Sequence, residues 1–171
     1  MMRRAMSRWL PSLPSTPTAL ETPLLRAKKI LVPIQGALID LETVKVAGEI
    51  ARRDNGTVYA VHVIEVDRSL PLEEPIQSAL NRSVKICDQV DNIASESKYS
   101  IETEVLQARD AGPAIVDEAF EREVDLIFIG LKYKERFGEY SMGTFVPHIL
   151  QHAPCMVCVY RESMSETAQS L

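Results

Sequence analysis

The residues best suited to chemistry lie between Val124 and Thr144, in the sequence VDLIFIGLKYKERFGEYSMGT. An apolar run of strand-forming residues ends at Gly130, a polar loop follows, and Gly143-Thr144 precede the short helical pattern FVPHILQH. A loop that joins a strand to a helix start presents backbone N–H groups and the positive end of the helix dipole to a ligand. Anionic groups bind at such places, so this segment is a candidate phosphate-binding loop. Three cations in the loop either approach the phosphates or are solvated loop charges: Lys132, Lys134 and Arg136.

Other chemically capable residues have simpler explanations. His148 and His152 share a helix face at a metal-compatible spacing, but no third ligand is evident and no metal site is predicted. Cys155 and Cys158 are three apart in an expected strand, so they point to opposite faces and are interpreted as small buried hydrophobes. His62 is expected to be a hydrogen-bonded core residue. No hydrolytic triad is evident, and no catalytic residue is predicted.

Composition excludes several classes of protein. The 171 residues carry a formal charge of −5 and suit one domain with tails. No basic stripe interleaved with aromatic residues is present, which argues against nucleic-acid binding. No apolar run reaches the roughly 18 residues of a membrane span. Three cysteines do not make a disulfide framework, which favours a reducing compartment and a cytoplasmic location.

The chain divides into three parts. Residues 1–26 hold four arginines against one acid and are rich in Pro, Ser and Thr, so they are predicted to form a disordered extension. An arginine-rich start of this kind also has some character of a transit peptide. Residues 27–161 are expected to form the folded domain, and residues 162–171 a flexible tail.

Alternating patterns predict a βαβαβαβαβ order in the folded part. Strands are expected at 28–35, 57–64, 101–107, 124–130 and 154–160, the third of them at a sheet edge. Asp40 is expected to cap the first helix, and Asn55-Gly56 to end it. The second and third helices are expected to bury two apolar stripes: Ile76, Leu80, Val84, Cys87, Val90 and Ala94; and Ile115, Val116, Ala119 and Phe120. This order predicts a parallel, doubly wound sheet whose ligand lies beyond the strand ends near Gln35-Gly36 and Gly130.

Four motifs together resemble a universal stress protein domain over about residues 28–161. They are ILVPIQG, AVHVIE, the G…GT loop and HAPCMVCVYR. The resemblance implies a flavodoxin-like α/β three-layer sandwich with helices on both faces. Its sheet would be five-stranded and mostly parallel, in the order 3-2-1-4-5. The resemblance also implies a dimer in most members.

ATP-binding members of this family carry G-x2-G-x9-G-[S/T], and here the spacing is kept while Tyr133 replaces the second glycine. Gln35 replaces an aspartate that usually contacts the adenosine. The resemblance implies ATP or another adenine nucleotide as ligand, with or without Mg²⁺. The implied nucleotide-binding residues are Pro33, Gln35, Val63, Gly130, Tyr133, Gly143, Thr144 and Phe145.

The favoured function is therefore a nucleotide-responsive binding or regulatory protein that acts as a homodimer in stress response, rather than an enzyme. The alternative is a member without ATP that works through its dimer surface or N-terminal arm, as Tyr133 and Gln35 suggest. A weak nucleotide hydrolase is the least favoured hypothesis. The last strand is apolar yet expected at a sheet edge, so it is predicted to form the dimer interface: Cys155, Met156, Val157, Cys158 and Val159.

Overall fold

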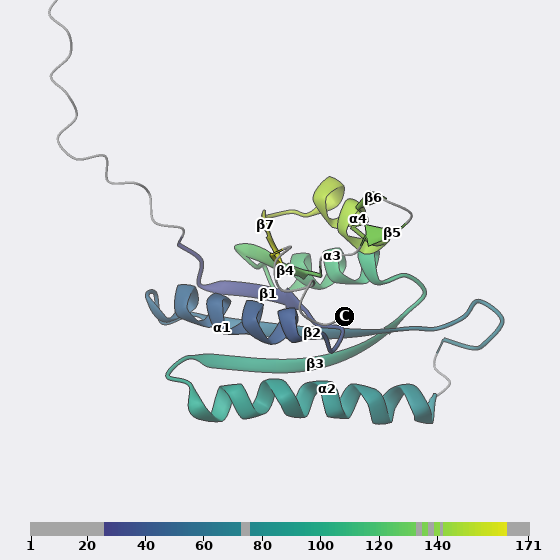
Figure 1. Cartoon of the computed structure of the whole chain (residues 1–171), viewed down its shortest axis with the longest axis horizontal. Coiled ribbons are helices and arrows are strands. Elements are labelled where there is room, and N and C mark those ends of the chain that lie inside the picture. Colours follow the sequence, from purple (N-terminus) through teal and green to yellow (C-terminus); the bar gives the residue numbers. More distant parts are fainter. Residues whose placement is uncertain (1–25, 73–75, 133–134, 137–138, 141, 164–171) are drawn as a thin grey trace, which may run out of the picture.

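Short apolar runs form the strands of one sheet, and amphipathic helices connect them (Figure 1). The computed structural model describes residues 26–72, 76–132, 135–136, 139–140 and 142–163. In chain order the elements are β1 (Lys29–Pro33), α1 (Leu38–Arg52), β2 (Thr57–Glu65), α2 (Gln77–Glu96), β3 (Ser100–Ala108), α3 (Ala111–Glu121), β4 (Leu126–Leu131), β5 (Glu135–Arg136), β6 (Glu139–Tyr140), α4 (Phe145–His152) and β7 (Met156–Arg161).

The main sheet has five strands in the order β3-β2-β1-β4-β7. Every pairing in it is parallel, from β2 with β3 at one side to β4 with β7 at the other. The predicted order is confirmed, with β7 in the fifth position, and β3 lies at an edge as expected. Parallel neighbours require crossover connections, and each crossover between neighbouring strands here contains a helix.

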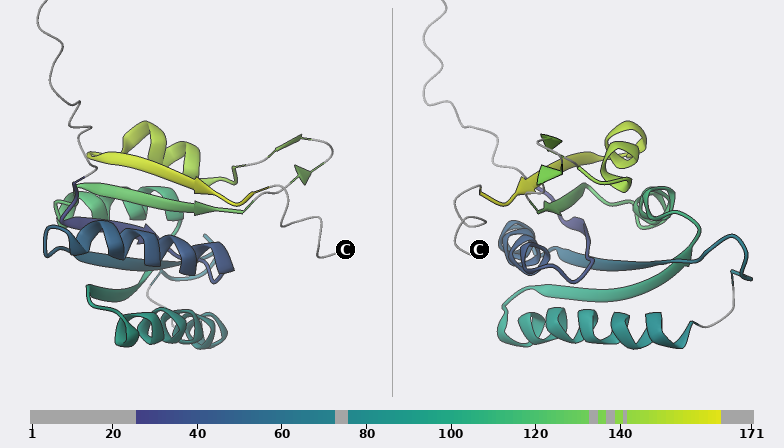
Figure 2. Two further views of the ribbon diagram at one scale, coloured as in Figure 1. Left: turned by 60° about the vertical axis from the view of Figure 1, so that its left-hand side comes forward. Right: turned by 45° about the vertical axis from the view of Figure 1, so that its right-hand side comes forward.

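Helices cover both faces of the sheet (Figures 1 and 2). Along β1, Ile30 and Val32 pack toward α1 and α2, whereas Leu31 packs toward α3 and α4. Successive side chains of a strand point to opposite faces, so each central strand contributes to two core layers. The three-layer α/β sandwich is confirmed. No helix among the described residues is long and apolar enough to cross a membrane.

Two helices bury different faces from those predicted. In α2 the buried residues are Ser83, Ile86 and Val90, while Val84 is 56% exposed. In an α-helix, a side chain four residues further along is rotated by about 40° around the helix axis. The predicted stripe takes two such steps from Ile76 to Val84, so Val84 no longer faces the core. In α3, Ile115 and Ala119 are buried as expected, but Phe120 is 72% exposed. The predicted burial of Val84 and Phe120 was wrong.

The polar loop after β4 contains a small hairpin that the sequence did not predict. Residues of β5 and β6 pair antiparallel, separately from the main sheet. Tyr133 and Lys134 lie outside the described residues, as does Phe137. The expectations about the N-terminal extension before Arg26 and the tail after Ser163 concern residues that also lie outside that part.

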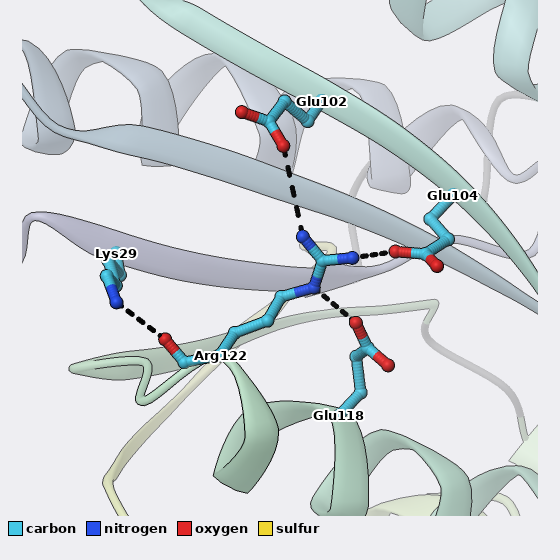
Figure 3. A network of polar contacts seen from close by, with 5 residues as sticks. All are labelled: Lys29, Glu102, Glu104, Glu118 and Arg122. Atoms are coloured by element: carbon cyan, nitrogen blue, oxygen red, sulfur yellow. Dashed lines mark hydrogen bonds and ion pairs between the residues drawn. The ribbon is translucent and has the colours of Figure 1, made fainter.

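Arg122, directly after α3, ties this helix to the exposed edge of the sheet (Figure 3). Its guanidinium group pairs with Glu118 and Glu104, and lies 3.8 Å from the Glu102 carboxylate. The same group stacks 4.6 Å from the centre of the Tyr59 ring. Because Glu102 and Glu104 belong to β3 and Tyr59 to β2, one cation joins a helix and two strands.

Candidate functional site: two adjoining clefts at the strand ends

A first cleft opens beyond the C-terminal ends of β1 and β4, against the start of α4. Its volume is about 410 Å³, and its walls include Pro33 and Gln35 from the end of β1. Gly130 and Lys132 line it from the end of β4, and Gly143 and Thr144 from the start of α4. Parallel strands direct their C-terminal ends to one edge, where ligands of open α/β sheets bind.

A second cleft of about 310 Å³ adjoins the first, and Gln35, Thr144 and Phe145 line both. It extends across the end of β2, where His62, Val63 and Glu65 line it, and reaches Arg82 on α2. The two clefts therefore adjoin at these three residues and form one joint hollow.

The structure brings together the residues that the sequence singled out, apart from Tyr133, which lies outside the described part of the chain. Those that line one or both clefts are Pro33, Gln35, Val63, Gly130, Gly143, Thr144 and Phe145. Lys132 also lines the first cleft. Lys134 lies outside the described residues, and the structure does not describe the side chain of Arg136.

The two glycines of the loop are needed for different physical reasons. At Gly130 a Cβ atom would lie 2.5 Å from Thr43 Oγ1 and 3.1 Å from the Ile39 carbonyl oxygen, so α1 packs where a side chain would stand. At Gly143 a Cβ would meet nothing within 4 Å, but φ is +76°. That backbone conformation favours glycine strongly. The absence of a side chain at Gly130 thus allows α1 to pack closely against β4, and Gly143 allows the turn before α4.

The start of α4 lines both clefts. Thr144 is the N-cap residue and is exposed, and its side chain forms no capping hydrogen bond. The first N–H groups of a helix have no partner within the helix and attract anions. By contrast, the start of α3 already has a carboxylate, since Ala111 N donates to Glu65 Oε1 at 2.9 Å.

Asp40 organises the turn between β1 and α1. The helix begins at Leu38 with Ala37 as N-cap, so the prediction of Asp40 as the cap was wrong. From the third helical position its Oδ2 accepts hydrogen bonds from Gln35 N at 2.7 Å and Ala37 N at 2.9 Å. A carboxylate can reach back from this position to the N–H groups before a helix. Asp40 is 4% exposed and lines the first cleft, where burial raises the pKa of its carboxyl despite these hydrogen bonds.

His62 forms its expected hydrogen bond but is only half-buried, and it faces the second cleft. Its Nδ1 lies 2.8 Å from the Ile34 carbonyl oxygen. A carbonyl oxygen only accepts, so Nδ1 must carry the proton of this bond, and Nε2 of the neutral ring is an acceptor. His62 therefore offers the cleft a polar group of fixed tautomer.

Comparison with known proteins decides the family. A model of the universal stress protein family matches residues 26–161. The chain belongs to the universal stress protein family. A universal stress protein of Methanocaldococcus jannaschii is 30% identical over 145 residues, which cover 81% of this chain and 85% of that protein.

Solved structures of the family share the fold. The universal stress protein UspA of Lactobacillus plantarum aligns with a TM-score of 0.63 at 23% identity, over 80% of this chain and 99% of that one. A universal stress protein of Archaeoglobus fulgidus in complex with dAMP aligns with a TM-score of 0.60 at 19% identity, over 80% and 98% of the two chains. At these identities the likeness establishes the flavodoxin-like fold alone.

Several residues of this universal stress protein's clefts were not singled out as site residues from sequence: Asp40, His62, Glu65 and Arg82. His62 directly precedes Val63 at the end of β2, so its place in the sequence could have indicated that it lines the cleft. Asp40 could have been recognised as an acidic residue in the first turn of a helix that follows a strand end. Arg82 gave no such indication, because the packing of α2 over the end of β2 joins distant parts of the chain.

The cysteines point to opposite faces as expected but are only half-buried, and the histidines form a stacked pair. Cys155 and Cys158 pack on opposite faces of the sheet, and burial raises the pKa of both thiols. The rings of His148 and His152 stack at 4.2 Å, and His152 Nδ1 lies 2.9 Å from the His148 carbonyl oxygen. Within the described residues no group of three or more potential ligands could hold a metal ion.

Proposed function

We propose that this universal stress protein binds an adenine nucleotide in the two adjoining clefts and acts as a nucleotide-responsive regulatory protein. The observation that carries the proposal is the joint hollow itself, whose two parts meet at the start of α4, where the Thr144 side chain makes no capping hydrogen bond. The second cleft has both apolar and polar groups in its wall, which suits a base and ribose. The first cleft has the start of α4 and Lys132 in its wall, which suit phosphates.

Charge sets the direction of the bound nucleotide. Lys132 lines the first cleft together with the start of α4, so positive charge in this cleft attracts phosphate. We expect the phosphates at Gly143-Thr144 with Lys132 alongside, and the base at Val63 and His62 in the second cleft. Mg²⁺ would accompany ATP through its phosphate oxygens. The complex of the Archaeoglobus fulgidus relative with dAMP supports an adenine nucleotide as ligand.

Calorimetric titration with ATP, ADP and AMP, each with and without Mg²⁺, tests the proposal. We expect saturable binding, and Gly143→Ala should weaken it roughly ten-fold, because a side chain at positive φ distorts the turn before α4. Lys45→Ala on the exposed face of α1 is the control and should bind like the parent. Absence of binding at millimolar nucleotide would refute the proposal. Phosphate release measured on the same samples separates binding from slow hydrolysis.

The second candidate is a family member that does not use ATP. Gln35 supports it, since an uncharged side chain lines both clefts where ATP-binding members usually have aspartate. Tyr133 supports it through sequence alone. Tyr133→Gly discriminates between the two candidates: a gain of ATP affinity would mean that the tyrosine obstructs the site, and unchanged absence of binding would favour the second candidate.

We also propose that the protein is a homodimer through β7. This edge strand exposes Met156, Val159 and Tyr160 by 49%, 37% and 39%. An apolar edge with unpaired backbone groups favours association with a second strand, and a second copy of β7 is the partner of matching pattern.

A further inference from the structure

Phe120 marks a second surface, remote from the nucleotide clefts. The side chain projects from the last turn of α3 and is 72% exposed. It lines a shallow groove of about 270 Å³ together with Val116 on the same helix and Pro154 before β7. An aromatic ring, an aliphatic side chain and a proline thus form an apolar floor between α3 and the end of α4.

The rim of this groove is acidic. Asp117 and Glu121 line it from α3, and His152 closes it at the end of α4. No ion pair joins Asp117 or Glu121 to another of the residues that the structure describes. An apolar floor with carboxylates beside it suits a segment that combines aromatic or aliphatic side chains with arginines.

The chain enters the fold beside this groove. Lys28 N and Lys29 N donate to Asp125 Oδ2 at 2.8 and 2.9 Å, so β1 begins next to the start of β4. Lys29 Nζ donates to the Arg122 carbonyl oxygen at 2.8 Å, directly after α3 (Figure 3). Met156 N donates to the Asp125 carbonyl oxygen, which brings the start of β7 to the same end of the sheet. Arg26 precedes β1, so it lies at the same end of the sheet as the groove.

We propose that the groove binds the N-terminal segment of this same chain, residues 1–25. The segment carries complementary side chains, with three arginines among apolar residues: Arg3, Arg4 and Arg8, with Met6, Trp9, Leu10 and Leu13. Between Trp9 and Arg26 an extended chain spans roughly 55 Å, which is ample to reach the groove. The C-terminal segment is a poor occupant, since β7 ends at the opposite end of the sheet and residues 164–171 hold no basic side chain.

Trp9 makes this docking measurable, because it is the single tryptophan of the chain. In the 171-residue chain at micromolar concentration we expect blue-shifted emission and reduced quenching by acrylamide. Phe120→Asp should red-shift the emission and should lower the ratio of docked to undocked segment by about ten-fold. Val84→Asp is the matched control, since Val84 is an exposed apolar residue on α2, on the other face of the sheet, and should leave Trp9 unchanged.

Charge provides an independent arm of the experiment. The double variant Asp117→Lys with Glu121→Lys should weaken docking. High salt should weaken docking in the parent but not in the variant, where it screens the repulsion between the new lysines and the arginines of the segment. Circular dichroism melting of each variant confirms that the fold is retained. Trp9 emission that is the same in the parent and in Phe120→Asp would overturn the proposal. A blue shift that appears only as protein concentration rises would also overturn it, because the occupant would then belong to another molecule.

Discussion

The Asp40 carboxylate lies at the wall of the first cleft, and one of its oxygens accepts two backbone N–H groups from the turn after β1. Burial raises the pKa of this carboxyl above its ordinary value. The folded state therefore takes up the proton at a higher pH than the unfolded state does. Its contribution to stability is fully present below the ordinary pKa and is lost as pH rises through the raised one.

Asp40→Asn isolates this effect, because asparagine keeps an acceptor oxygen and does not titrate. In urea unfolding between pH 4 and 7, the free energy of unfolding of the parent minus that of Asp40→Asn should fall as pH rises. Relative to Asp40→Asn, Asp40→Ala should be less stable by about 1–3 kcal/mol at every pH, since two backbone N–H groups lose their acceptor. A parent-minus-Asn difference that does not change with pH would contradict the expected raised pKa.

The two glycines of the loop show which features of the site could be predicted from the sequence. The resemblance to ATP-binding family members implied one loop in which Gly130 and Gly143 both serve the ligand. The structure gives Gly130 a packing role against Thr43 and Ile39, which no local pattern reports. Gly143 has positive φ directly before a helix, which the local sequence could indicate. Local backbone demands were therefore accessible from sequence, and contacts between distant segments were not.

At the scale of elements, Arg122 determines how α3 is held to the sheet edge. Three carboxylates surround its guanidinium group, and Glu118 and Glu104 form the close pairs. Arg122→Ala should lower the free energy of unfolding by about 2 kcal/mol, because the acids are left facing one another without a cation. Arg122→Lys should recover only part of the loss, since one ammonium group cannot contact several carboxylates and stack on Tyr59.

Arg52→Ala is the control for this prediction. Arg52 pairs with Glu49 at 2.8 Å, but both side chains are more than half exposed. Exposed pairs within a helix contribute only about 0.3–0.5 kcal/mol, so this variant should stay close to the parent in urea unfolding. If Arg52→Ala and Arg122→Ala lower the free energy of unfolding equally, the ion pairs of Arg122 contribute no more to stability than an exposed pair does.

The existence of elements was more predictable than the faces that they bury. The α4 pattern FVPHILQH matches the helix residue for residue, and Asn55 adopts positive φ at the end of α1 as expected. Val84 and Phe120 were misplaced because the burial of a helical residue depends on what the sheet covers. Phe120 lies in the last turn of α3, where neither the sheet nor α4 covers it fully. Such coverage is a tertiary property, so apolar spacing alone could not predict it.

At the scale of the whole molecule, topology was predictable because few sheets satisfy the rules for parallel crossovers. The alternating pattern of β3 indicated one edge, and the resemblance placed β7 at the other. The position of the clefts followed from the strand ends. What the topology could not supply is the contribution of α2, whose Arg82 lines the second cleft.

The exposed edge of β7 gives the last prediction, on the oligomeric state. Val157 packs into the core beside α3 and α4, so a charge there would disturb the fold as well as an interface. Met156 and Val159 are more exposed and lie on opposite faces of the strand, which makes them the sharper sites. In a twofold dimer each substitution occurs twice, so Met156→Lys and Val159→Lys should each convert the dimer to monomer, because like charges meet across the paired edges.

Light scattering after size exclusion measures the result, and Val105→Lys on β3 provides the control at the other edge. Val105 is 36% exposed, so it matches Val159 in exposure and side chain. The control should remain dimeric while both β7 variants become monomeric with unchanged circular dichroism. If instead Val105→Lys alone yields monomer, the subunits associate through β3. If none of the three changes the mass, neither sheet edge forms the interface and the proposal for β7 fails.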